Sequence, residues 1–262
     1  MTVPTDQILL RADADGVATL TLNRPAARNA LSTGLMSALQ AEIDAIASDP
    51  AVRVVVIAAN GPAFCAGHDL REVRGTPTRT AYEALFAQCS ALMLSIMRLP
   101  QPVIARVQAT ATAAGCQLVA TCDLAVAAES AKFATPGVNI GLFCSTPMVA
   151  VSRNLGRKQT MEMLLTGDMI DANAALEAGL VNKSVPDTEL DTAIGEYCTQ
   201  IVSKSPLTLK IGKEAFYRQL EMPLDDAYAY ASEVMVTNML ARDAGEGIDA
   251  FLEKRAPEWT GE

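Results

Sequence analysis

The strongest constraint on the fold is a recurring unit in which an apolar segment leads into a loop of small residues and then into a helical pattern. The apolar segments are Val54–Ala58, Val103–Val107 and Leu124–Ala128. Val54–Ala58 is apolar on both faces, as expected of a strand in a parallel sheet that helices cover on both sides. The first two-thirds of the chain therefore predict an α/β fold.

The pattern changes towards the C-terminus. From Asp187 onward the sequence predicts only helices separated by polar breaks, at 187–203, 207–219, 224–240 and 243–253. A chain of 262 residues is one large domain, or one domain with an appendage. We place the division near residue 200, which gives an α/β core over 1–200 and a helical region over 201–262.

Two loops of small residues share one design. Gly61–Arg71 and Ala109–Gln117 each follow an apolar strand and lead into a helix, and the first contains His68, the only histidine of the chain. Main-chain N–H groups from two such loops can converge on one oxygen atom and form an oxyanion hole. A helix that begins at Ala114–Gly115 would add its dipole. The plainer alternative is that both segments are ordinary connections.

Composition limits the classes of partner. The formal net charge of −9 argues against bulk binding to nucleic acid or to an anionic membrane. It leaves room for a small anionic ligand, because a few cationic side chains and main-chain N–H groups suffice. No segment reaches the roughly 18 consecutive apolar residues that a membrane-spanning helix needs.

The N-terminal segment and the cysteines suggest an intracellular protein. The N-terminus lacks the basic and apolar regions of a secretory signal, so we expect a cytoplasmic location. No CxxC spacing is present, so we expect reduced thiols and no metal site; the cysteines occur singly, at 65, 89, 116, 122, 144 and 198.

A set of short motifs spread over nearly the whole chain resembles the crotonase (enoyl-CoA hydratase/isomerase) superfamily. Each motif is weak alone, but the set is specific in its order and spacing. The closest resemblance is to the subgroup called "enoyl-CoA hydratase domain-containing" in animals. The motifs include Asn23-Arg24-Pro25, Arg28-Asn29-Ala30-Leu31, Phe64-Cys65-Ala66-Gly67-His68-Asp69-Leu70, Pro102-Val103-Ile104-Ala105, Ala114-Gly115-Cys116-Gln117-Leu118, Phe133-Ala134-Thr135-Pro136 and Leu165-Thr166-Gly167-Asp168.

The resemblance implies a fold, a ligand and an assembly. The fold would be a spiral of ββα units followed by a C-terminal all-helical region used in trimerisation. The ligand would be an acyl-CoA thioester, with coenzyme A as part of the substrate and no permanently bound cofactor. The assembly would be a homotrimer or a dimer of trimers.

The resemblance also implies roles for individual residues. The backbone N–H groups of His68 and Ala114 would form the oxyanion hole for the thioester carbonyl. The remaining residues would bind the coenzyme: Ala66 and Leu70 along its length, Arg28 and Ala30 beside the pantetheine or phosphates, Asp69 and Gly115 in the same two loops, and Lys213 and Phe216 at the nucleotide end. For Asp69, a helix cap or turn is the alternative interpretation.

Two departures from the family pattern bear on the chemistry. Hydratases of this family carry one glutamate where this chain has Gln117 and a second where it has Gly137. A glutamine can orient a water molecule but cannot take its proton, and a glycine offers no side chain. Since general acid–base catalysis contributes typically 10²–10⁴-fold, we expect very low hydratase activity. Glutamates introduced at both positions should raise it.

Other groups could supply chemistry in place of the glutamates. Ser145 falls where related dienoyl-CoA isomerases carry an aspartate, but a serine is a poor base by itself. A hydrolytic pair of Ser145 or Cys144 with His68 would need the histidine ring to reach the nucleophile. The alternative is that only the main chain of His68 matters.

Three functional hypotheses remain open at this stage. The chain could be an enzyme that uses an oxyanion hole for isomerisation, decarboxylation or thioester hydrolysis of an acyl-CoA rather than for hydration. An Ala-Gly-His-Asp loop also occurs in a methylmalonyl-CoA decarboxylase relative. It could instead be a non-catalytic acyl-CoA-binding protein. A scaffold protein without a CoA ligand is the third possibility, and the intact loop at 66–70 together with Arg28 argues against it.

Overall fold

The computed structural model describes residues 7–262 and begins with an antiparallel hairpin. Strand β1 (Leu9–Ala14) pairs with β2 (Val17–Leu22). The turn between them is Asp15-Gly16, and both residues have positive φ, at 51° and 79°. Positive φ at both central positions defines the type I′ turn, whose twist matches that of the flanking strands. The sequence predicts this pair with a longer turn, Asp13–Gly16.

The hairpin opens a six-stranded sheet whose remaining pairs are all parallel. Its order is β1-β2-β3-β5-β7-β10. The added strands are β3 (Val54–Ala59), β5 (Val103–Val107), β7 (Leu124–Ala128) and β10 (Lys183–Val185). Consecutive strands of this sheet are thus neighbours in space, and the sequence correctly predicts the central three.

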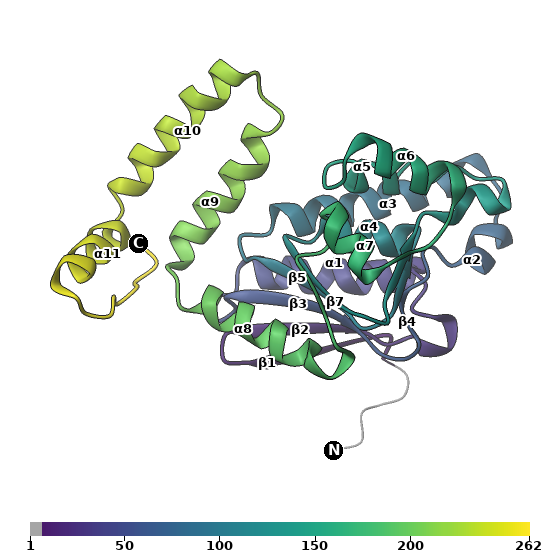
Figure 1. Cartoon of the computed structure of the whole chain (residues 1–262), viewed down its shortest axis with the longest axis horizontal. Helices are drawn as coiled ribbons and strands as arrows, with labels where there is room; N and C mark the ends of the chain where they lie inside the picture. The colour runs from purple at the N-terminus through teal and green to yellow at the C-terminus, as the bar shows by residue number, and fades with distance from the viewer. Residues whose placement is uncertain (1–6) are drawn as a thin grey trace.

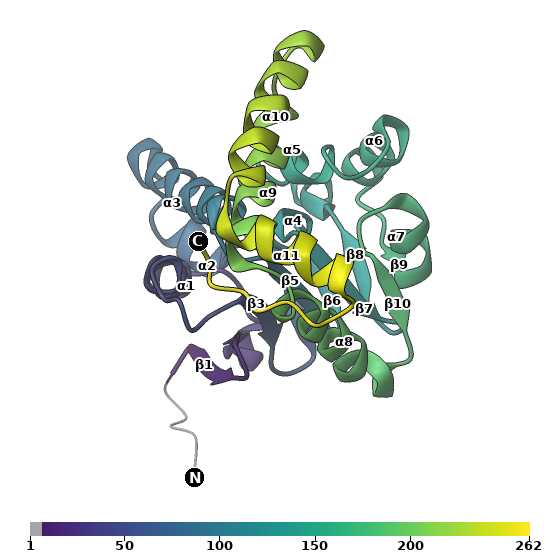
Figure 2. The same ribbon diagram turned by 90° about the vertical axis from the view of Figure 1, so that its left-hand side faces the viewer.

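A smaller sheet turns the strand–helix alternation into a spiral of ββα units. Its order is β4-β6-β8-β9, from β4 (Ala63–Cys65), β6 (Thr110–Thr112), β8 (Lys132–Ala134) and β9 (Ile170–Asp171). Strands β3, β5 and β7 are each followed by one strand of this second sheet and then by helices (Figures 1 and 2). The structure confirms the α/β fold class and the ββα spiral. The sequence patterns predicted β8 but missed β4, β6 and β9, which are only two or three residues long.

Helices cover both faces of the large sheet. In β3, Val55 and Ile57 belong to the main core, together with residues of α1 (Thr33–Ala47), α3 (Arg79–Arg98) and α4 (Ala114–Thr121). Val54 and Val56 belong to a second core that includes Ile194 of α8 (Leu190–Val202). All six residues of β3 are buried, which confirms that this strand is covered on both sides.

The other helices complete the spiral and continue beyond it. The sequence predicts all of them except the short α2. Asp171 caps α7 by accepting a hydrogen bond from the Ala174 amide at 2.8 Å. The helices are α2 (Leu70–Gly75), α5 (Pro147–Val151), α6 (Arg157–Thr166), α7 (Ala172–Ala178), α9 (Pro206–Gln219), α10 (Leu224–Met239) and α11 (Arg242–Glu253), with short 3-10 turns at Pro25–Ala27, Pro136–Ile140 and Asp187–Glu189.

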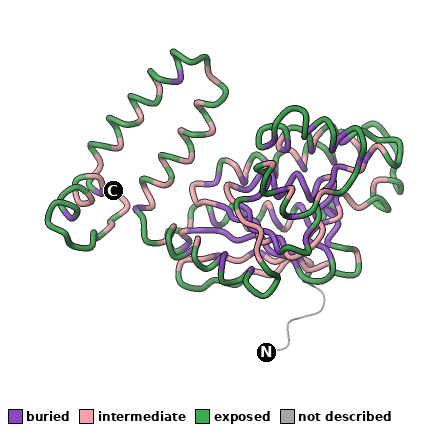
Figure 3. Tube along the Cα trace, in the orientation of Figure 1, coloured by how far each residue is buried: buried purple, intermediate pink, exposed green. Residues whose placement is uncertain are grey.

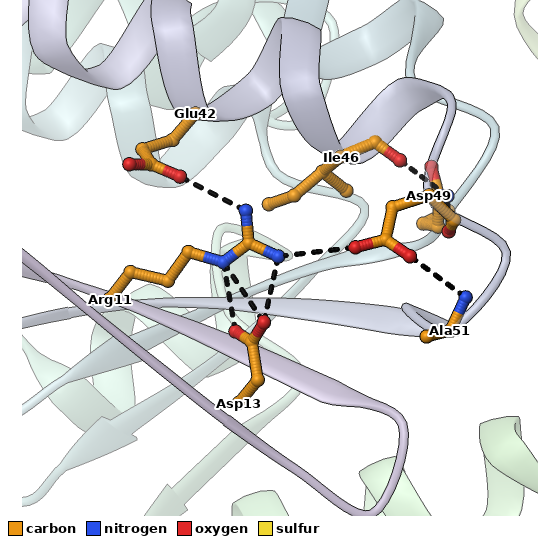
Figure 4. Close-up of polar contacts among 7 residues, drawn as sticks. Arg11, Asp13, Glu42, Ile46, Asp49 and Ala51 are labelled. Atoms are coloured by element: carbon orange, nitrogen blue, oxygen red, sulfur yellow. Dashed lines mark hydrogen bonds and ion pairs between the residues drawn. The ribbon is translucent and has the colours of Figure 1, made fainter.

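An ion-pair network fastens the first hairpin to α1 (Figure 4). The Arg11 guanidinium lies 2.7 Å from Asp13, 3.1 Å from Glu42 of α1 and 3.4 Å from Asp49 in the turn after α1. The hydrogen bond from Arg11 lowers the pKa of Asp13. Asp49 also accepts a hydrogen bond from the Ala51 amide at 3.0 Å, so the network holds β1, α1 and the approach to β3 together.

Helix α3 is long and apolar enough to cross a membrane by length and composition alone. Its buried side chains belong to the main core beside α1 and α4. They are Leu85, Cys89, Leu92, Met93 and Ile96.

Helices α9 to α11 extend away from the sheets (Figures 1 and 3). None of the side chains of α9 is fully buried, and α10 buries only Ala227. Large apolar side chains on these helices are instead exposed: Leu224 by 72%, Leu240 by 83% and Phe251 by 81%. These helices therefore present apolar surface that the single chain does not cover.

The last residues of the chain return along α11 and fasten it to the start of α9 (Figure 2). Asp243, which is 1% exposed, accepts hydrogen bonds from the Ser205 hydroxyl and from the amides of Thr260 and Gly261. Burial alone would raise the pKa of this carboxyl, but these hydrogen bonds outweigh it and hold the pKa below its usual range. Trp259, the only tryptophan, donates to the Ser203 carbonyl at 2.8 Å.

The Asp243 contact predicts pH-dependent release of the C-terminal tail. Because the folded-state pKa is lowered, the stabilisation is complete above the unfolded pKa of about 3.9 and is lost as the pH falls through the folded value. Fluorescence of Trp259 should report release in that acidic range. Asp243→Asn should weaken tail docking at pH 7 by about 2 kcal/mol and remove this pH response. Identical pH profiles for the variant and the wild type would contradict the assignment.

Candidate functional site

The loop after β4 is held by the segment around residue 30. The Ala66 amide donates to the Arg28 carbonyl at 3.1 Å, and the Leu31 amide donates to the Gly67 carbonyl at 2.8 Å. The Asp69 amide then donates to the Leu31 carbonyl at 3.2 Å. Three main-chain hydrogen bonds thus fix the loop from 66 to 69.

This bonding pattern leaves the His68 amide free. The Leu31 amide bonds to the carbonyl of the residue before His68, and the Leu31 carbonyl bonds to the amide of the residue after it. This is the pattern of a parallel β-bridge between Leu31 and His68. In such a bridge the amide of the intervening residue points away from the partner strand. Within residues 7–262 the His68 N–H donates no hydrogen bond.

The second loop turns sharply into α4. Ala113 has φ 51° and ψ −119°, which is a rare conformation for a residue other than glycine. Its amide donates to the Ala134 carbonyl at 2.9 Å, and its carbonyl accepts the first hydrogen bond of α4, from Gln117, at 3.0 Å. Ala114 is the first helical residue, where the amide has no partner inside the helix. None of the other described residues accepts a hydrogen bond from it.

The two loops lie against each other because β4 and β6 are neighbouring parallel strands. A Cβ atom placed on Gly67 would lie 3.4 Å from the Ala114 nitrogen and 2.9 Å from the Ala113 Cβ. Two unpartnered amides, one preceding α2 and one starting α4, therefore sit side by side. Such a pair can bind a carbonyl oxygen and stabilise negative charge that develops on it.

The His68 ring does not form a catalytic pair with a described residue. Both ring nitrogens are buried and make no hydrogen bond with any residue in 7–262, and the ring packs edge-on against Phe86 of α3 with 5.8 Å between centroids. Burial lowers the pKa of His68, while the nearby Leu31 carbonyl and Glu72 carboxylate oppose that effect. The ring is therefore neutral at pH 7, and the packing favours the interpretation in which the main chain of His68 matters.

Gln117 lines a large cavity. Its side chain is buried, and its Oε1 atom has no hydrogen-bond partner among the described residues. The cavity has a volume of about 770 Å³ and runs between α3, α4, α5 and α9. Such a volume is typical of small-molecule sites. Met93, Met97 and Val149 supply apolar lining.

The space that a side chain at residue 137 would need is occupied by the loop that follows Gly137. The Leu142 amide donates to the Gly137 carbonyl at 2.9 Å. A Cβ atom on Gly137 would lie only 2.8 Å from the Leu142 oxygen and 2.9 Å from the Cys144 sulfur. The chain thus lacks both the carboxylate and the space for a side chain here. The expectation that two introduced glutamates simply restore hydration needs correction for this steric reason.

Ser145 lies beside this loop, on its exposed side. Its Oγ donates to the Phe143 carbonyl at 3.3 Å, and no hydrogen bond joins it to His68. Cys144 is buried, and burial raises the pKa of its thiol. The structure brings neither residue together with the imidazole as a nucleophile–base pair, so a hydrolytic pair with His68 is not formed.

The residues expected along the coenzyme surround the first loop. Arg28 is exposed and has a left-handed backbone, with φ 51°. Ala30 is buried, Ala66 is partly buried, and Leu70 is 54% exposed. These residues border the loop that carries the His68 amide, and their contact with a coenzyme stays a prediction.

Asp69 and Gly115 have clear structural tasks. Asp69 caps α2 through the Arg71 amide and pairs with Arg24 at 3.0 Å, which lowers the pKa of the carboxyl. The helix cap expected from the sequence as the alternative role of Asp69 is therefore present. Gly115 lies against β4, where a Cβ atom would approach the Cys65 oxygen to 2.1 Å.

Lys213 and Phe216 lie on α9, and only Phe216 is exposed, by 55%. The Lys213 ammonium pairs with Asp123 at 2.6 Å and donates to the carbonyls of Ile96 and Gln101. Tyr217 donates to the same Asp123 at 2.8 Å. Lys213 therefore anchors α9 to the end of α3, and these contacts occupy the ammonium group expected to meet the nucleotide.

Two positions that shape the site were not singled out from the sequence. Asn29 is fully buried, accepts from the Arg24 amide and donates to the carbonyls of Asn60 and Ala63, each at 2.8 Å. It holds the segment that in turn fixes the His68 loop. Ala113 is the other, and no local sequence signal marks an alanine for positive φ, whereas a lone Asn in a polar loop could have been recognised.

Comparisons with known proteins agree with this architecture. The model of the enoyl-CoA hydratase/isomerase family matches residues 12–262. The mitochondrial enoyl-CoA hydratase domain-containing protein 3 of Rattus norvegicus is 45% identical over 94% of this chain and 82% of its own length. The crystal structure of a Mycobacterium smegmatis enoyl-CoA hydratase matches with a TM-score of 0.95 and 54% identity, covering 97% and 99% of the two chains. The human enoyl-CoA hydratase domain-containing protein 3 matches with a TM-score of 0.94 and 45% identity, covering 97% and 100%.

The cytoplasmic location expected from the sequence is wrong by this comparison. The rat and human relatives, 45% and 46% identical, are named as mitochondrial proteins. The expectation relied on the missing features of a secretory signal. Mitochondrial targeting segments are amphipathic and rich in arginine and serine, so that test does not address them.

The family assignment rests on agreement between the site and the whole chain. The adjacent amides of His68 and Ala114 occur in the ββα spiral that the resemblance predicts. The family model extends over nearly all of the sequence, and the relatives share the subgroup name expected from the motifs. This chain is a member of the enoyl-CoA hydratase/isomerase (crotonase) family, similar to enoyl-CoA hydratase domain-containing protein 3.

Proposed function

We propose that this protein binds an acyl-CoA thioester and holds the thioester oxygen between the N–H groups of His68 and Ala114. The observation that carries the proposal is the pair of adjacent, unpartnered amides, of which one begins a helix. Negative charge develops on this oxygen when the thioester forms an enolate or is attacked at its carbonyl carbon. The amides and the dipole of α4 stabilise both species.

The proposal assigns low activity to ordinary hydration. Hydration of an enoyl-CoA needs a base for the water and an acid for the α-carbon. Gln117 provides neither, and Gly137 has no side chain. Gln117 Oε1 is an unpaired buried acceptor, so it orients a water molecule or a polar substrate group in the cavity.

Reactions with a weaker need for a base suit the site better. Loss of CO₂ from a malonyl-type thioester leaves the electron pair of the broken bond in an enolate, and the enolate then takes a proton from solvent. Isomerisation of an enoyl-CoA and thioester hydrolysis are further candidates, and Ser145 would have to move to take part. Non-catalytic binding of acyl-CoA is the second candidate function, favoured by the filled space at Gly137.

We further propose that the protein assembles as a homotrimer or a dimer of trimers through α9 to α11. The exposed apolar side chains of these helices support this arrangement. Sedimentation analysis should give a mass three or six times that of the 27.7 kDa chain; a monomer would contradict it.

A panel of thioesters tests the proposed function. Crotonyl-CoA, a β,γ-enoyl-CoA and methylmalonyl-CoA are each incubated with the protein, and binding is measured alongside product formation. We expect binding of acyl-CoA with little hydration of crotonyl-CoA. Fast hydration would refute the role given to Gln117 and Gly137, and absence of binding to every thioester would refute the function as a whole.

Substitution at the two departure positions makes a further prediction. Gln117→Glu should raise crotonyl-CoA hydration, because it returns one acid–base group to the cavity. Adding Gly137→Glu should lower the yield of folded protein rather than raise activity further, because its Cβ meets the Leu142 oxygen. Gly137→Ala is the steric control. A stable, more active double variant would show that the loop from 137 to 144 moves easily.

A further inference from the structure

The cavity lined by Gln117 carries an excess of cationic side chains, although the chain carries a net charge of −9. Its lining includes more cationic side chains than carboxylates. The cations are Arg98, Arg153, Lys210, Lys213 and Arg218, and the carboxylates are Glu214 and Glu221.

Two of these cations remain available for a ligand. Lys213 is paired with Asp123, Arg153 is paired with Glu221, and Arg218 lies over the Tyr230 ring at 4.6 Å. Arg98 and Lys210, from α3 and α9, form no ion pair or hydrogen bond with any residue in 7–262. Glu214 is the one lining carboxylate that forms no ion pair within the same residues.

Helix α3 runs from the neighbourhood of the His68 ring to Arg98. Phe86 touches the His68 ring, and Arg98 lies twelve residues further along the same helix. At a rise of 1.5 Å per residue the separation is about 18 Å. Helix α4 runs from Ala114 at the amide pair to Gln117 and Thr121 at the cavity. The cavity thus lies one helical turn beyond Ala114, and Gln117, apolar side chains, Arg98 and Lys210 all line it.

We infer that the acyl group of the ligand carries a carboxylate at the end remote from its thioester, and that Arg98 and Lys210 bind this carboxylate. The inference rests on the proposed function, since it assumes that the thioester oxygen lies at His68 and Ala114. An apolar middle section with cations beyond it matches an acyl chain that is charged only at its end. The CoA phosphates are the other anionic groups that these cations could bind.

Binding measurements with two matched thioesters separate these possibilities. Tetradecanoyl-CoA and its ω-carboxylated counterpart are titrated against wild-type protein and against Arg98→Met/Lys210→Met. The wild type should bind the ω-carboxylated ester about fivefold more tightly. The double variant should lose this preference and keep its affinity for tetradecanoyl-CoA. Arg157→Met/Lys158→Met removes two exposed charges from α6, outside the cavity lining, and should keep the wild-type preference.

Three results would overturn the inference. Equal wild-type affinity for the two esters would show that the cavity does not select a terminal carboxylate. An equal loss of affinity for both esters in the double variant would assign the cations to the CoA phosphates. Failure of the wild type to bind either ester would refute the proposed function itself, which distinguishes that failure from the first two.

Discussion

Gly115→Ala should destabilise the protein severely, by about 3 kcal/mol or more. The added Cβ would lie 2.1 Å from the Cys65 oxygen and 2.7 Å from the Cys65 carbon. Both are backbone atoms, so no side-chain rotation can relieve the overlap. Helix α4 would have to move away from β4, and the amides of His68 and Ala114 would separate. Thermal unfolding should show a midpoint lowered by on the order of 10 °C.

Gly195→Ala provides the matched control. Gly195 lies within α8, and a Cβ atom there would meet no atom within 4 Å. Alanine is the better helix former, so this variant should gain about 0.5–1 kcal/mol. If both variants unfolded at the wild-type temperature, the close approach of α4 to β4 would not be a feature of the folded protein.

The Gly115 contact illustrates what the sequence could and could not predict. The small-residue pattern from 109 to 117 correctly predicts a turn followed by a helix that starts near residue 115. It gives no information on which strand the glycine meets, because β4 is a three-residue strand without a periodicity of its own. That contact depends on the pairing of β4 with β6, which is set by the whole spiral.

Lys213 marks a second limit of sequence-based prediction. Its place in the family pattern suggests a free ammonium group near the nucleotide. In the structure, burial lowers the pKa of Lys213 while Asp123 opposes that effect, and the side chain ties α9 to the end of α3. The partner Asp123 is 90 residues earlier in the sequence, so neither local spacing nor charge pattern identifies the pair. The same holds for Arg98 and Lys210, which line one cavity although they are far apart in the sequence.

The main strands were easier to predict from the sequence than these long-range contacts, because a strand is marked by its local pattern of apolar residues. The apolar segment at Val54 predicts a strand buried on both faces, and all of β3 is buried. The departures at Gln117 and Gly137 were also recognised from the sequence. Only the structure shows that the Gly137 position is occupied by Leu142 and Cys144, because this depends on how the following loop folds back.

Ala114→Pro should reduce any thioester turnover by about 10²–10³-fold while leaving the fold in place. Proline removes one proposed donor of the oxyanion hole, and loss of one such donor costs this much in other enzymes. Ala114 is the first residue of α4, where proline is accepted because its missing N–H has no helical partner. The reaction rate should therefore change more than the stability.

Ala172→Pro is the control for the substitution itself. Ala172 is the first residue of α7 and, like Ala114, is 1% exposed. It lies outside the cavity lining, so its replacement should leave acyl-CoA binding and turnover close to wild type. An equal loss of activity in both variants would attribute the effect to proline rather than to the missing donor.

The vibrational frequency of the bound thioester tests the central claim most directly, since it requires no knowledge of the reaction. Crotonyl-CoA labelled with ¹³C at its carbonyl is bound to the protein, and its C=O stretch is recorded by difference infrared spectroscopy. Two N–H donors polarise the carbonyl, so we expect a band at lower wavenumber than in water, with most of the shift lost in Ala114→Pro. A bound thioester whose band matches that in water, or whose shift survives the substitution, would contradict an oxyanion hole formed by His68 and Ala114.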